Sequence, residues 1–428
     1  MKLSEIHEIA EMQKNYLLSS DSGLKREILD FLPPLASHAL IISGIRRCGK
    51  STLLHQYVQK KNEDFFYLHF EDIRLYDFQM KDFVLLDKVI DRSTQKLLFF
   101  DEIQSVKAWE LYVRQKLDQG YRVILTGSNA SLLSRELGTK LTGRHITQDL
   151  FPFSYSEFIA FKNLKSSIES LNKYMHTGGF PEFVKNENPE TLKNLIDDIL
   201  YRDIVVRHGI KDASSVKRLL SYLLFNAAQL TTPSKLTDIA GVKSSTTVLE
   251  YFSYFEDSYL ITLLPKFSYS AKSQMLSPKK VYVSDTGLIR AGSVPLTENW
   301  GYFLENLVFL HLLRQTKELY YFHENNRECD FVQLENGRLK NLLQVCWELN
   351  TDNEEREING LLNAMRHFKS TKGTIITANQ QDILYQGDLE IEVIPAWKFL
   401  STPPSSCGWR RPTGGPPLRH ALRAYKRN

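Results

Sequence analysis

The sequence is poor in cysteine, and its cysteines lie far apart. Only four occur in 428 residues, and no two of them form a Cys-x-x-Cys pair. This spacing argues against a disulfide framework and against a zinc ribbon. Reduced thiols are typical of the cytosol, so we expect a cytoplasmic protein. The four are Cys48, Cys329, Cys346 and Cys407.

Long apolar runs are also absent from the sequence. No run approaches the roughly eighteen residues that a membrane-spanning helix needs. The charged start, MKLSEIHEIAEMQK, lacks the apolar core of a signal peptide. The sequence therefore predicts no membrane partner.

The body of the chain has no large excess of either charge. The formal charge is +4, but the last 28 residues carry six Lys and Arg and no acid, so without those six the charge is −2. A near-neutral body provides no general electrostatic reason to expect nucleic acid. The tail itself, 401–428, is rich in Pro, Gly and Arg and is predicted to be disordered. The tail is a solvated or non-native extension, or, as the alternative, it contacts nucleic acid.

The most informative motif is a phosphate-binding loop of the Walker A type. Residues 44–52 read GIRRCGKST, between an apolar run at 39–42 and a helix-compatible stretch at 53–59. In such a loop, backbone N–H groups surround a β-phosphate and the following helix directs its positive dipole end at the same charge. Lys50 would reach the β- and γ-phosphates, and Ser51 would ligate Mg²⁺. The predicted nucleotide-binding residues are Gly44, Arg46, Arg47, Cys48, Gly49, Lys50, Ser51 and Thr52.

A second buried strand is predicted to supply the acids that hydrolysis requires. Residues 97–102 read LLFFDE, four apolar residues followed by two carboxylates. In this Walker B arrangement Asp101 would hold Mg²⁺ and Glu102 would polarise the attacking water. Apolar strands that end in acids are common in α/β proteins, so this interpretation depends on its pairing with the Walker A loop.

Two further candidates follow the next strand. The expected strand at 122–125 leads into TGSN, so Ser128 or Asn129 could touch the γ-phosphate or its water; an ordinary turn is the alternative. Arg144 could act as an arginine finger in the same or a neighbouring subunit, or it could be a solvated residue or an ion-pair partner. The guanine-reading N-K-x-D loop is replaced here by TGSN, so we expect ATP as the cofactor, together with Mg²⁺.

Taken in order, these motifs resemble a known family. GIRRCGKSTLL, FEDIRL, LLFFDEIQ, LTGSNASLLS, LTGRHITQDLFPFSYSEF and GGFPEF, then YRDIV, VYVSDTGL, GYFLENLVF and ECDFV, resemble the bacterial and archaeal ATPases that join an AAA-like domain to a DUF4143 domain. The resemblance covers about residues 10–400 and implies an ATP-binding, ATP-hydrolysing protein.

The predicted fold class is α/β, with a parallel-sheet P-loop NTPase domain of AAA-like type. A helical and winged-helix segment follows it, and then a restriction-endonuclease-like α/β domain. The expected boundaries are a helical lead-in at 1–35, the ATPase core at 36–155, a helical subdomain at 156–210, a winged-helix-like segment at 211–270, the endonuclease-like domain at 271–400 and the tail.

The winged-helix interpretation rests on three expected helices, at 216–229, 233–240 and 244–259, with a turn at Gly241. The third helix offers Ser, Thr and Tyr but almost no basic residue. DNA binding is therefore one option, and a structural or protein-docking role is the other.

The endonuclease-like interpretation is incomplete at its chemical centre. Glu305 and Asp330 match the helix glutamate and strand aspartate of that fold, but the strand that should read E-x-K reads Gln344-Val345-Cys346. Neither an amide nor a thiol replaces a hard carboxylate and an ammonium. Nuclease activity is therefore not expected, and the two acids could simply make polar contacts.

Three functional hypotheses remain open. The first is an ATPase that acts as a molecular switch on an unknown protein partner or on DNA, with a homo-oligomer as an open option. The second is a DNA-binding or nuclease-related protein regulated by ATP. The third is a nucleotide-binding interaction protein that hydrolyses nothing.

Overall fold

The structure is a computed structural model that describes residues 1–35, 37–93, 95–129, 143–292 and 299–402. It divides into two compact units, one formed by Met1–Phe151 and one by the described residues from Pro152 onward. The predicted tail lies outside the described residues from residue 403. The finer domain boundaries stay predictions.

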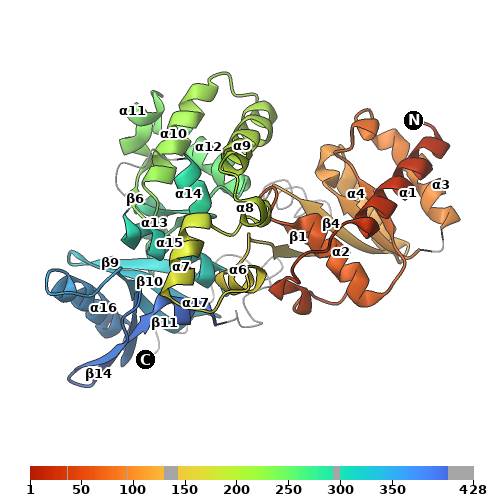
Figure 1. Ribbon diagram of the computed structural model, residues 1–428. Helices are drawn as coiled ribbons and strands as arrows, with labels where there is room; N and C mark the ends of the chain where they lie inside the picture. The colour runs from red at the N-terminus through yellow and green to blue at the C-terminus, as the bar shows by residue number, and fades with distance from the viewer. Residues whose placement is uncertain (36, 94, 130–142, 293–298, 403–428) are drawn as a thin grey trace. The chain divides into compact units, whose positions relative to one another are not determined.

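A five-stranded parallel sheet forms the centre of the first unit (Figure 1). The strands are β1 (Ala39–Ser43), β2 (Phe66–His69), β3 (Leu97–Asp101), β4 (Arg122–Gly127) and β5 (His145–Asp149). Their order is β2-β3-β4-β1-β5, so β4 lies between the two strands that carry the phosphate-binding loop and the acidic pair. The predicted parallel α/β domain is confirmed.

Helices cover both faces of this sheet, which explains why its strands are almost continuously apolar. Phe100 of β3 packs at one face with residues of α1, α3 and α4, whereas Phe99 meets Tyr57 of α2 at the other. The helical elements of this unit are α1 (Leu3–Ser19), η1 (Glu27–Asp30), α2 (Lys50–Lys61), η2 (Ile73–Leu75), η3 (Met80–Asp82), α3 (Phe83–Arg92), η4 (Ile103–Ser105) and α4 (Trp109–Asp118).

The second unit begins with helices. Several carry clear start signals: Ser154 and Glu157 form a capping box on the first, and Asp212 and Ser244 accept backbone N–H groups at two later ones. The helical elements between Tyr155 and Asp257 are α6 (Tyr155–Phe161), α7 (Ile168–Thr177), α8 (Pro181–Asn186), α9 (Glu190–Asp198), the π-helix η5 (Ile199–Val206), α10 (Ala213–Phe225), η6 (Pro233–Leu236), α11 (Thr237–Ala240) and α12 (Ser245–Asp257).

A small antiparallel sheet accompanies the last three of these helices. It contains β6 (Leu230–Thr231), β7 (Ile261–Leu264) and β8 (Lys279–Val283) in the order β6-β8-β7. Gly241 ends α11 at the turn that the sequence predicts, and the structure shows it in the left-handed conformation. The winged-helix identity of this segment stays a prediction, as does DNA binding by it.

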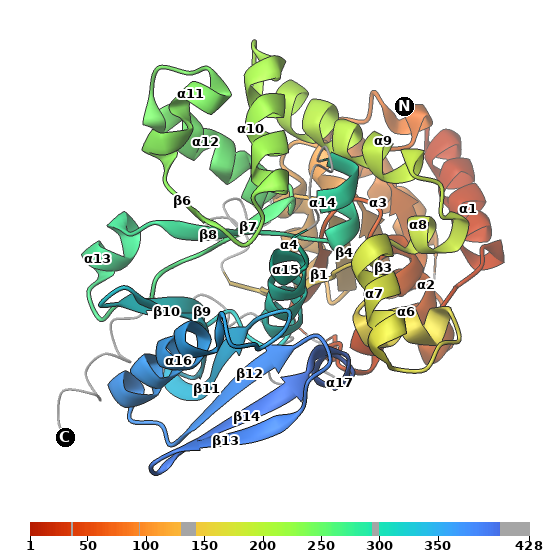
Figure 2. The same ribbon diagram turned by 60° about the vertical axis from the view of Figure 1, so that its left-hand side comes forward.

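A six-stranded mixed sheet forms the rest of the second unit, in the order β13-β14-β12-β11-β10-β9 (Figure 2). The helix α16 packs on one face of it, and α15 contacts the other face through Phe309 and Phe331. The endonuclease-like assignment of this sheet stays a prediction. The elements are α13 (Ala271–Leu276), α14 (Thr286–Gly292), α15 (Trp300–Leu313), β9 (Leu319–Glu324), β10 (Arg327–Glu335), β11 (Arg338–Val345), α16 (Glu354–Phe368), β12 (Lys372–Thr377), β13 (Asp382–Gln386), β14 (Leu389–Pro395) and α17 (Ala396–Leu400).

Candidate functional site

The candidate site lies at the carboxyl ends of β1, β3 and β4, where residues 44–49 connect β1 to α2. The loop approaches its neighbours very closely: a Cβ at Gly44 would stand 2.1 Å from the carbonyl oxygen of Leu150. Gly49 has φ 99° and directly precedes the first residue of α2, and Arg47 also has a positive φ of 63°. These left-handed residues bend the backbone into the compact loop that the motif requires.

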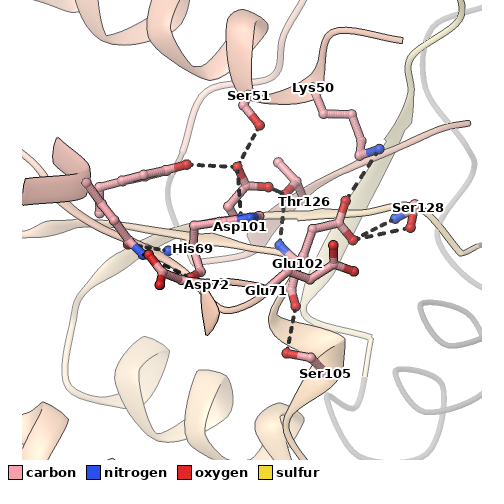
Figure 3. Close-up of polar contacts among 12 residues, drawn as sticks. Lys50, Ser51, His69, Glu71, Asp72, Asp101, Glu102, Ser105, Thr126 and Ser128 are labelled. Carbon is pink, nitrogen blue, oxygen red and sulfur yellow. Dashed lines mark hydrogen bonds and ion pairs between the residues drawn. The ribbon is translucent and has the colours of Figure 1, made fainter. Parts of the chain in front are cut away.

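Lys50 begins α2 and points into the site (Figure 3). Its Nζ donates to the carbonyl oxygens of Gly44 and Ile45 at 3.2 and 3.4 Å and lies 3.5 Å from Oε1 of Glu102. Burial lowers the pKa of Lys50, but the negative charge of Glu102 and smaller contributions from Cys48 and Asp101 together outweigh burial, so the pKa is raised. A buried, fully charged ammonium is therefore available for an anionic ligand.

Asp101 is the centre of a hydroxyl cluster. Ser51 Oγ and Tyr67 OH donate to Oδ2 of Asp101 at 2.6 and 2.9 Å, and Thr126 Oγ1 donates to its Oδ1. Asp101 is 1% exposed. Hydroxyl donors on both carboxylate oxygens fix the rotamer of Asp101 and direct it at the first turn of α2.

Glu102 adopts a left-handed backbone conformation, with φ 52°. Its Oε2 accepts from the N–H and Oγ of Ser128, at 3.2 and 3.3 Å, and from Nε2 of Gln104. Burial raises the pKa of this carboxyl, but the Lys50 charge and the Gln104 hydrogen bond outweigh that effect and lower it. Strained residues of this kind persist where their surroundings hold them, and they are concentrated at functional sites.

A buried arginine from the N-terminal segment supports the loop. Arg26 is 3% exposed, and its Nη1 and Nη2 donate to the carbonyl oxygens of Cys48 and Phe151 at 2.9 and 2.7 Å. Its backbone N–H donates to Gln56 of α2 at 3.0 Å. The segment that the sequence analysis treats as a helical lead-in is thus attached to the phosphate-binding loop.

The other predicted nucleotide-binding residues lie on the same loop and helix. Arg46 forms an ion pair with Glu71 at 3.3 Å, Arg47 is exposed, and Thr52 is half-buried in the first turn of α2. The thiol of Cys48 is buried, which raises its pKa and leaves it unreactive. Their contacts with a nucleotide stay predictions.

Asn129 directly follows Ser128, which contacts Glu102, whereas Arg144 lies elsewhere. Asn129 is 1% exposed and follows Ser128 beyond the carboxyl end of β4. Arg144 precedes β5, its carbonyl oxygen accepts the N–H of Ala39 at the start of β1, and its guanidinium pairs with Asp118. It therefore lies at the end of β1 opposite the loop, and a catalytic role for it stays a prediction that requires a neighbouring subunit.

The donor set fits a hydrated Mg²⁺ bound together with phosphate. A serine hydroxyl and a carboxylate from different elements meet at 2.6 Å, and both are hard oxygen ligands. Ser51 and Asp101 are therefore the residues that would hold the ion, Ser51 directly and Asp101 directly or through water. As they stand, no group of three His, Cys, Asp or Glu side chains in the described part of the chain forms a complete metal cage, and an ion here would take its other ligands from nucleotide and water.

Sequence reasoning missed four contributors to this site: Arg26, Tyr67, Gln104 and Thr126. Gln104 stands two residues after Glu102, so its position could have been noticed. Thr126 belongs to the TGSN motif, but its contact with Asp101 becomes evident only once β4 is known to neighbour β3. Arg26 and Tyr67 carry no motif, and their roles depend on tertiary packing.

The two acids of the endonuclease-like interpretation also lie close together. Glu305 of α15 and Asp330 of β10 both accept from Nζ of Lys280, at 2.9 and 2.7 Å. Gln344 accepts the backbone N–H of Asp330 at 3.2 Å through Oε1. Lys280 was not among the predicted site residues.

Within the described ranges, the structure contains no helix with the length and apolarity needed to cross a membrane.

Family models match two parts of the chain. A model described as an AAA domain matches residues 36–159, so the AAA-like part of the resemblance is confirmed. A model described as a domain of unknown function, DUF8612, matches residues 168–294. The predicted DUF4143 domain is not shown, because the model that matches this region is a different one.

Two relatives match most of the chain. The uncharacterized protein MJ1544 of Methanocaldococcus jannaschii is 37% identical over 393 residues, which are 85% of this chain and 88% of that protein. An uncharacterized protein of Haemophilus influenzae is 30% identical over 382 residues, 83% of this chain and 93% of its own. Among solved structures, the RuvB Holliday junction branch migration motor of Thermotoga maritima covers 61% of this chain and 87% of its own, with 14% identity and a TM-score of 0.29, too low to carry a comparison.

Proposed function

This chain belongs to the same family as MJ1544 of M. jannaschii, and on that premise we propose that it binds Mg·ATP at the P-loop of its AAA domain and hydrolyses it. The proposal rests on two pairs of side chains that lie at the same edge of the sheet. Ser51 and Asp101 are 2.6 Å apart, and Lys50 and Glu102 are 3.5 Å apart. These are the four groups that phosphoryl transfer to water requires: a metal-ligand pair, a phosphate-binding cation and a water-orienting base.

In the proposed mechanism the loop N–H groups and Lys50 bind the phosphates. Lys50 exchanges its contact with Glu102 for phosphate oxygens, so its charge stays compensated throughout. Mg²⁺, held by Ser51 and Asp101, would neutralise charge on the phosphates. Glu102, released from Lys50 but still held by Ser128, would accept a hydrogen bond from the attacking water and orient it.

We propose that hydrolysis switches the chain between states that a protein partner distinguishes. A protein is favoured over DNA because α12, the helix that would read a groove, contains no Lys or Arg and carries Glu250, Glu256 and Asp257. Its exposed side includes Leu249, which is 53% exposed. An acidic helix is repelled by phosphates, whereas an exposed leucine suits contact with a protein.

A second candidate is a nucleotide-binding protein that does not hydrolyse ATP. It is favoured by one observation: both carboxylate oxygens of Glu102 are engaged, by Lys50, Ser128 and Gln104. If these contacts persist when nucleotide binds, Glu102 cannot orient water.

Steady-state phosphate release from Mg·ATP, with and without duplex DNA, tests the proposal. Wild type should turn over, and Glu102→Gln should lose about a hundredfold or more in turnover while still binding nucleotide, because the amide cannot act as a base. Lys50→Ala should lose binding. Glu63→Gln is the matched control, since Glu63 pairs with Arg122 at the amino end of β4.

Turnover that persists in Glu102→Gln would refute the role of Glu102, and equal loss of nucleotide binding in Glu102→Gln and Lys50→Ala would also refute it. Absence of turnover in wild type would favour the second candidate. Stimulation by DNA would overturn the preference for a protein partner.

A further inference from the structure

An ion pair connects the phosphate-binding loop to the segment that follows β2. Nη1 and Nη2 of Arg46 lie 3.3 Å from Oε2 and Oε1 of Glu71, so the guanidinium meets the carboxylate at two points. Glu71 belongs to the FEDIRL motif, and Figure 3 labels it among the polar side chains of the site. The Arg46 side chain is only 15% exposed, so most of it is shielded from water.

The backbone on both sides of Glu71 is held in place. The N–H of Phe70 donates to the carbonyl oxygen of Asp101 at 2.9 Å, and Phe70 is 3% exposed. On the other side, Asp72 accepts Nε2 of Gln13 from α1 at 2.9 Å. A carboxylate that stands between two fixed residues is preorganised to hold a guanidinium.

Arg46 lies close enough to Lys50 and Glu102 for its charge to act on both. Burial raises the pKa of Glu102, whereas the charge of Lys50 and the hydrogen bond from Gln104 lower it, and the charge of Arg46 lowers it further. Burial lowers the pKa of Lys50, and Arg46 adds a smaller effect in the same direction against the stronger charge of Glu102. In the proposed mechanism Lys50 binds the phosphates and Glu102 orients the attacking water. A charge that acts on both groups lies near the position of the γ-phosphate.

The chemistry of an arginine suits that position. Charge on the oxygens of the transferring phosphoryl group is commonly stabilised by an arginine, supplied by the same chain or by a neighbour. A guanidinium that contacts a carboxylate at two points can contact a phosphate in the same way. Arg144, which the sequence predicts for this role, precedes β5 at the opposite end of β1. Arg46 places the same group on the phosphate-binding loop itself.

On the premise that the P-loop binds and hydrolyses Mg·ATP, we propose that Arg46 is a catalytic arginine that acts in cis, and that Glu71 is its positioning residue. When ATP binds, Arg46 exchanges the carboxylate of Glu71 for oxygens of the γ-phosphate. After phosphate leaves, Arg46 returns to Glu71. Because ADP has no γ-phosphate, the pair of Arg46 with Glu71 is compatible with bound ADP and must open for ATP.

Arg46 forms and breaks no covalent bond in the reaction. The oxygen of the attacking water bonds to the γ-phosphorus, and one water proton passes to Glu102. The bond from the γ-phosphorus to the bridging oxygen breaks, and its electron pair stays on ADP. Arg46 compensates the negative charge of the phosphoryl group as it moves between the two oxygens.

Turnover tests the catalytic role. Arg46→Ala should lower kcat by at least about a thousandfold, as the loss of a transition-state arginine does, and should change ADP affinity by less than about threefold. The matched control is Arg74→Ala, because Arg74 pairs with Asp72 at 2.7 Å in the same segment and should be dispensable for turnover. Since Arg46 acts in cis, a mixture of Arg46→Ala and Lys50→Ala proteins should turn over no faster than the sum of the two alone.

Nucleotide binding tests the exchange without any need for turnover. Affinities for ADP and for the non-hydrolysable β,γ-imido analogue of ATP are measured by competition with a fluorescent ADP. Arg46→Ala should reduce the preference for the analogue over ADP by about tenfold, because a charged contact with the γ-phosphate is lost. Glu71→Gln should increase that preference by up to about fivefold, because the amide holds Arg46 less strongly than the carboxylate does. In the Arg46→Ala background, Glu71→Gln should have no further effect.

The outcomes separate this proposal from the proposed hydrolysis. Turnover that is present in wild type and survives in Arg46→Ala would overturn the role of Arg46 and leave hydrolysis standing, and restored turnover in the mixture would overturn its action in cis. Loss of ADP binding in Arg46→Ala as complete as in Lys50→Ala would make Arg46 a general phosphate ligand, which also contradicts the proposal. If wild type itself has no turnover, hydrolysis and the catalytic role both fail, and an equal preference for the analogue in wild type and Arg46→Ala would overturn the γ-phosphate contact as well. Independent effects of Glu71→Gln and Arg46→Ala would overturn the positioning role of Glu71.

Discussion

Replacing Tyr67 with phenylalanine removes one of the three hydroxyl groups that donate to Asp101. The Tyr67 side chain lies on β2, is 6% exposed and donates to Oδ2 at 2.9 Å. The change conserves the ring and its packing, so its effect comes mainly from the lost hydrogen bond. A hydrogen bond to a charged group contributes about 1.5–3 kcal/mol, and we expect Tyr67→Phe to lower the free energy of unfolding by that amount.

The same change should weaken the binding of Mg²⁺ together with ATP. Groups that orient a metal ligand typically change metal affinity by about 10–100-fold when they are removed, and Asp101 keeps the hydroxyls of Ser51 and Thr126. We therefore expect the lower end, an increase of about tenfold in the Mg²⁺ concentration that gives half-maximal phosphate release at saturating ATP.

The assay is a Mg²⁺ titration of phosphate release, with urea unfolding measured in parallel. Tyr57→Phe is the control, because Tyr57 is also 6% exposed but lies on α2, where its ring packs against Phe99. A stability loss in Tyr67→Phe without any change in Mg²⁺ dependence would show that Tyr67 is only structural. An unchanged Mg²⁺ dependence in both variants would refute the reasoning.

Three further predictions concern the supports of the site and the second unit. Gly44→Ala should weaken nucleotide binding by at least about tenfold, measured with a fluorescent ATP analogue, because the added Cβ would lie 2.1 Å from the Leu150 carbonyl oxygen. Arg26→Met should destabilise the chain by roughly 2–4 kcal/mol in urea and weaken nucleotide binding, because it removes the donors to the buried carbonyl oxygen of Cys48 and the partly buried one of Phe151. Unchanged binding would show that the loop holds its shape unaided. Burial raises the pKa of Asp285 to about 7, above its unfolded value, so the folded state binds this proton more tightly and the free energy of unfolding should fall as pH rises from about 4 to 7. Asp285→Asn should reduce that slope, measured by urea unfolding at a series of pH values, and an unaltered slope would contradict the assignment.

The P-loop, the acidic pair and the α/β class were predictable because each depends on residues that are neighbours in sequence. A loop between an apolar run and a helix places Lys50 and Ser51 without knowledge of the rest of the fold. Likewise, two acids after a buried strand place Asp101 and Glu102 at the carboxyl edge of a parallel sheet.

The remaining features depend on which strands become neighbours. The insertion of β4 between β1 and β3 brings Thr126 to Asp101, and the pairing of β2 with β3 brings Tyr67 there. The position of Arg144 follows from register: it precedes a strand whose start pairs with the start of β1, so it lies far from the loop. Lys280 reaches its carboxylates from a different sheet, and no local pattern indicates that contact.

The most direct test of the central claim is to identify the nucleotide that stays bound after incubation with Mg·ATP. Wild type and Glu102→Gln would each be separated from free nucleotide, and the bound fraction analysed by chromatography. We predict ADP on wild type and intact ATP on Glu102→Gln, because only wild type retains the base that orients water. Intact ATP on both proteins would contradict hydrolysis and leave a nucleotide-binding protein, and no retained nucleotide on either would contradict the site itself.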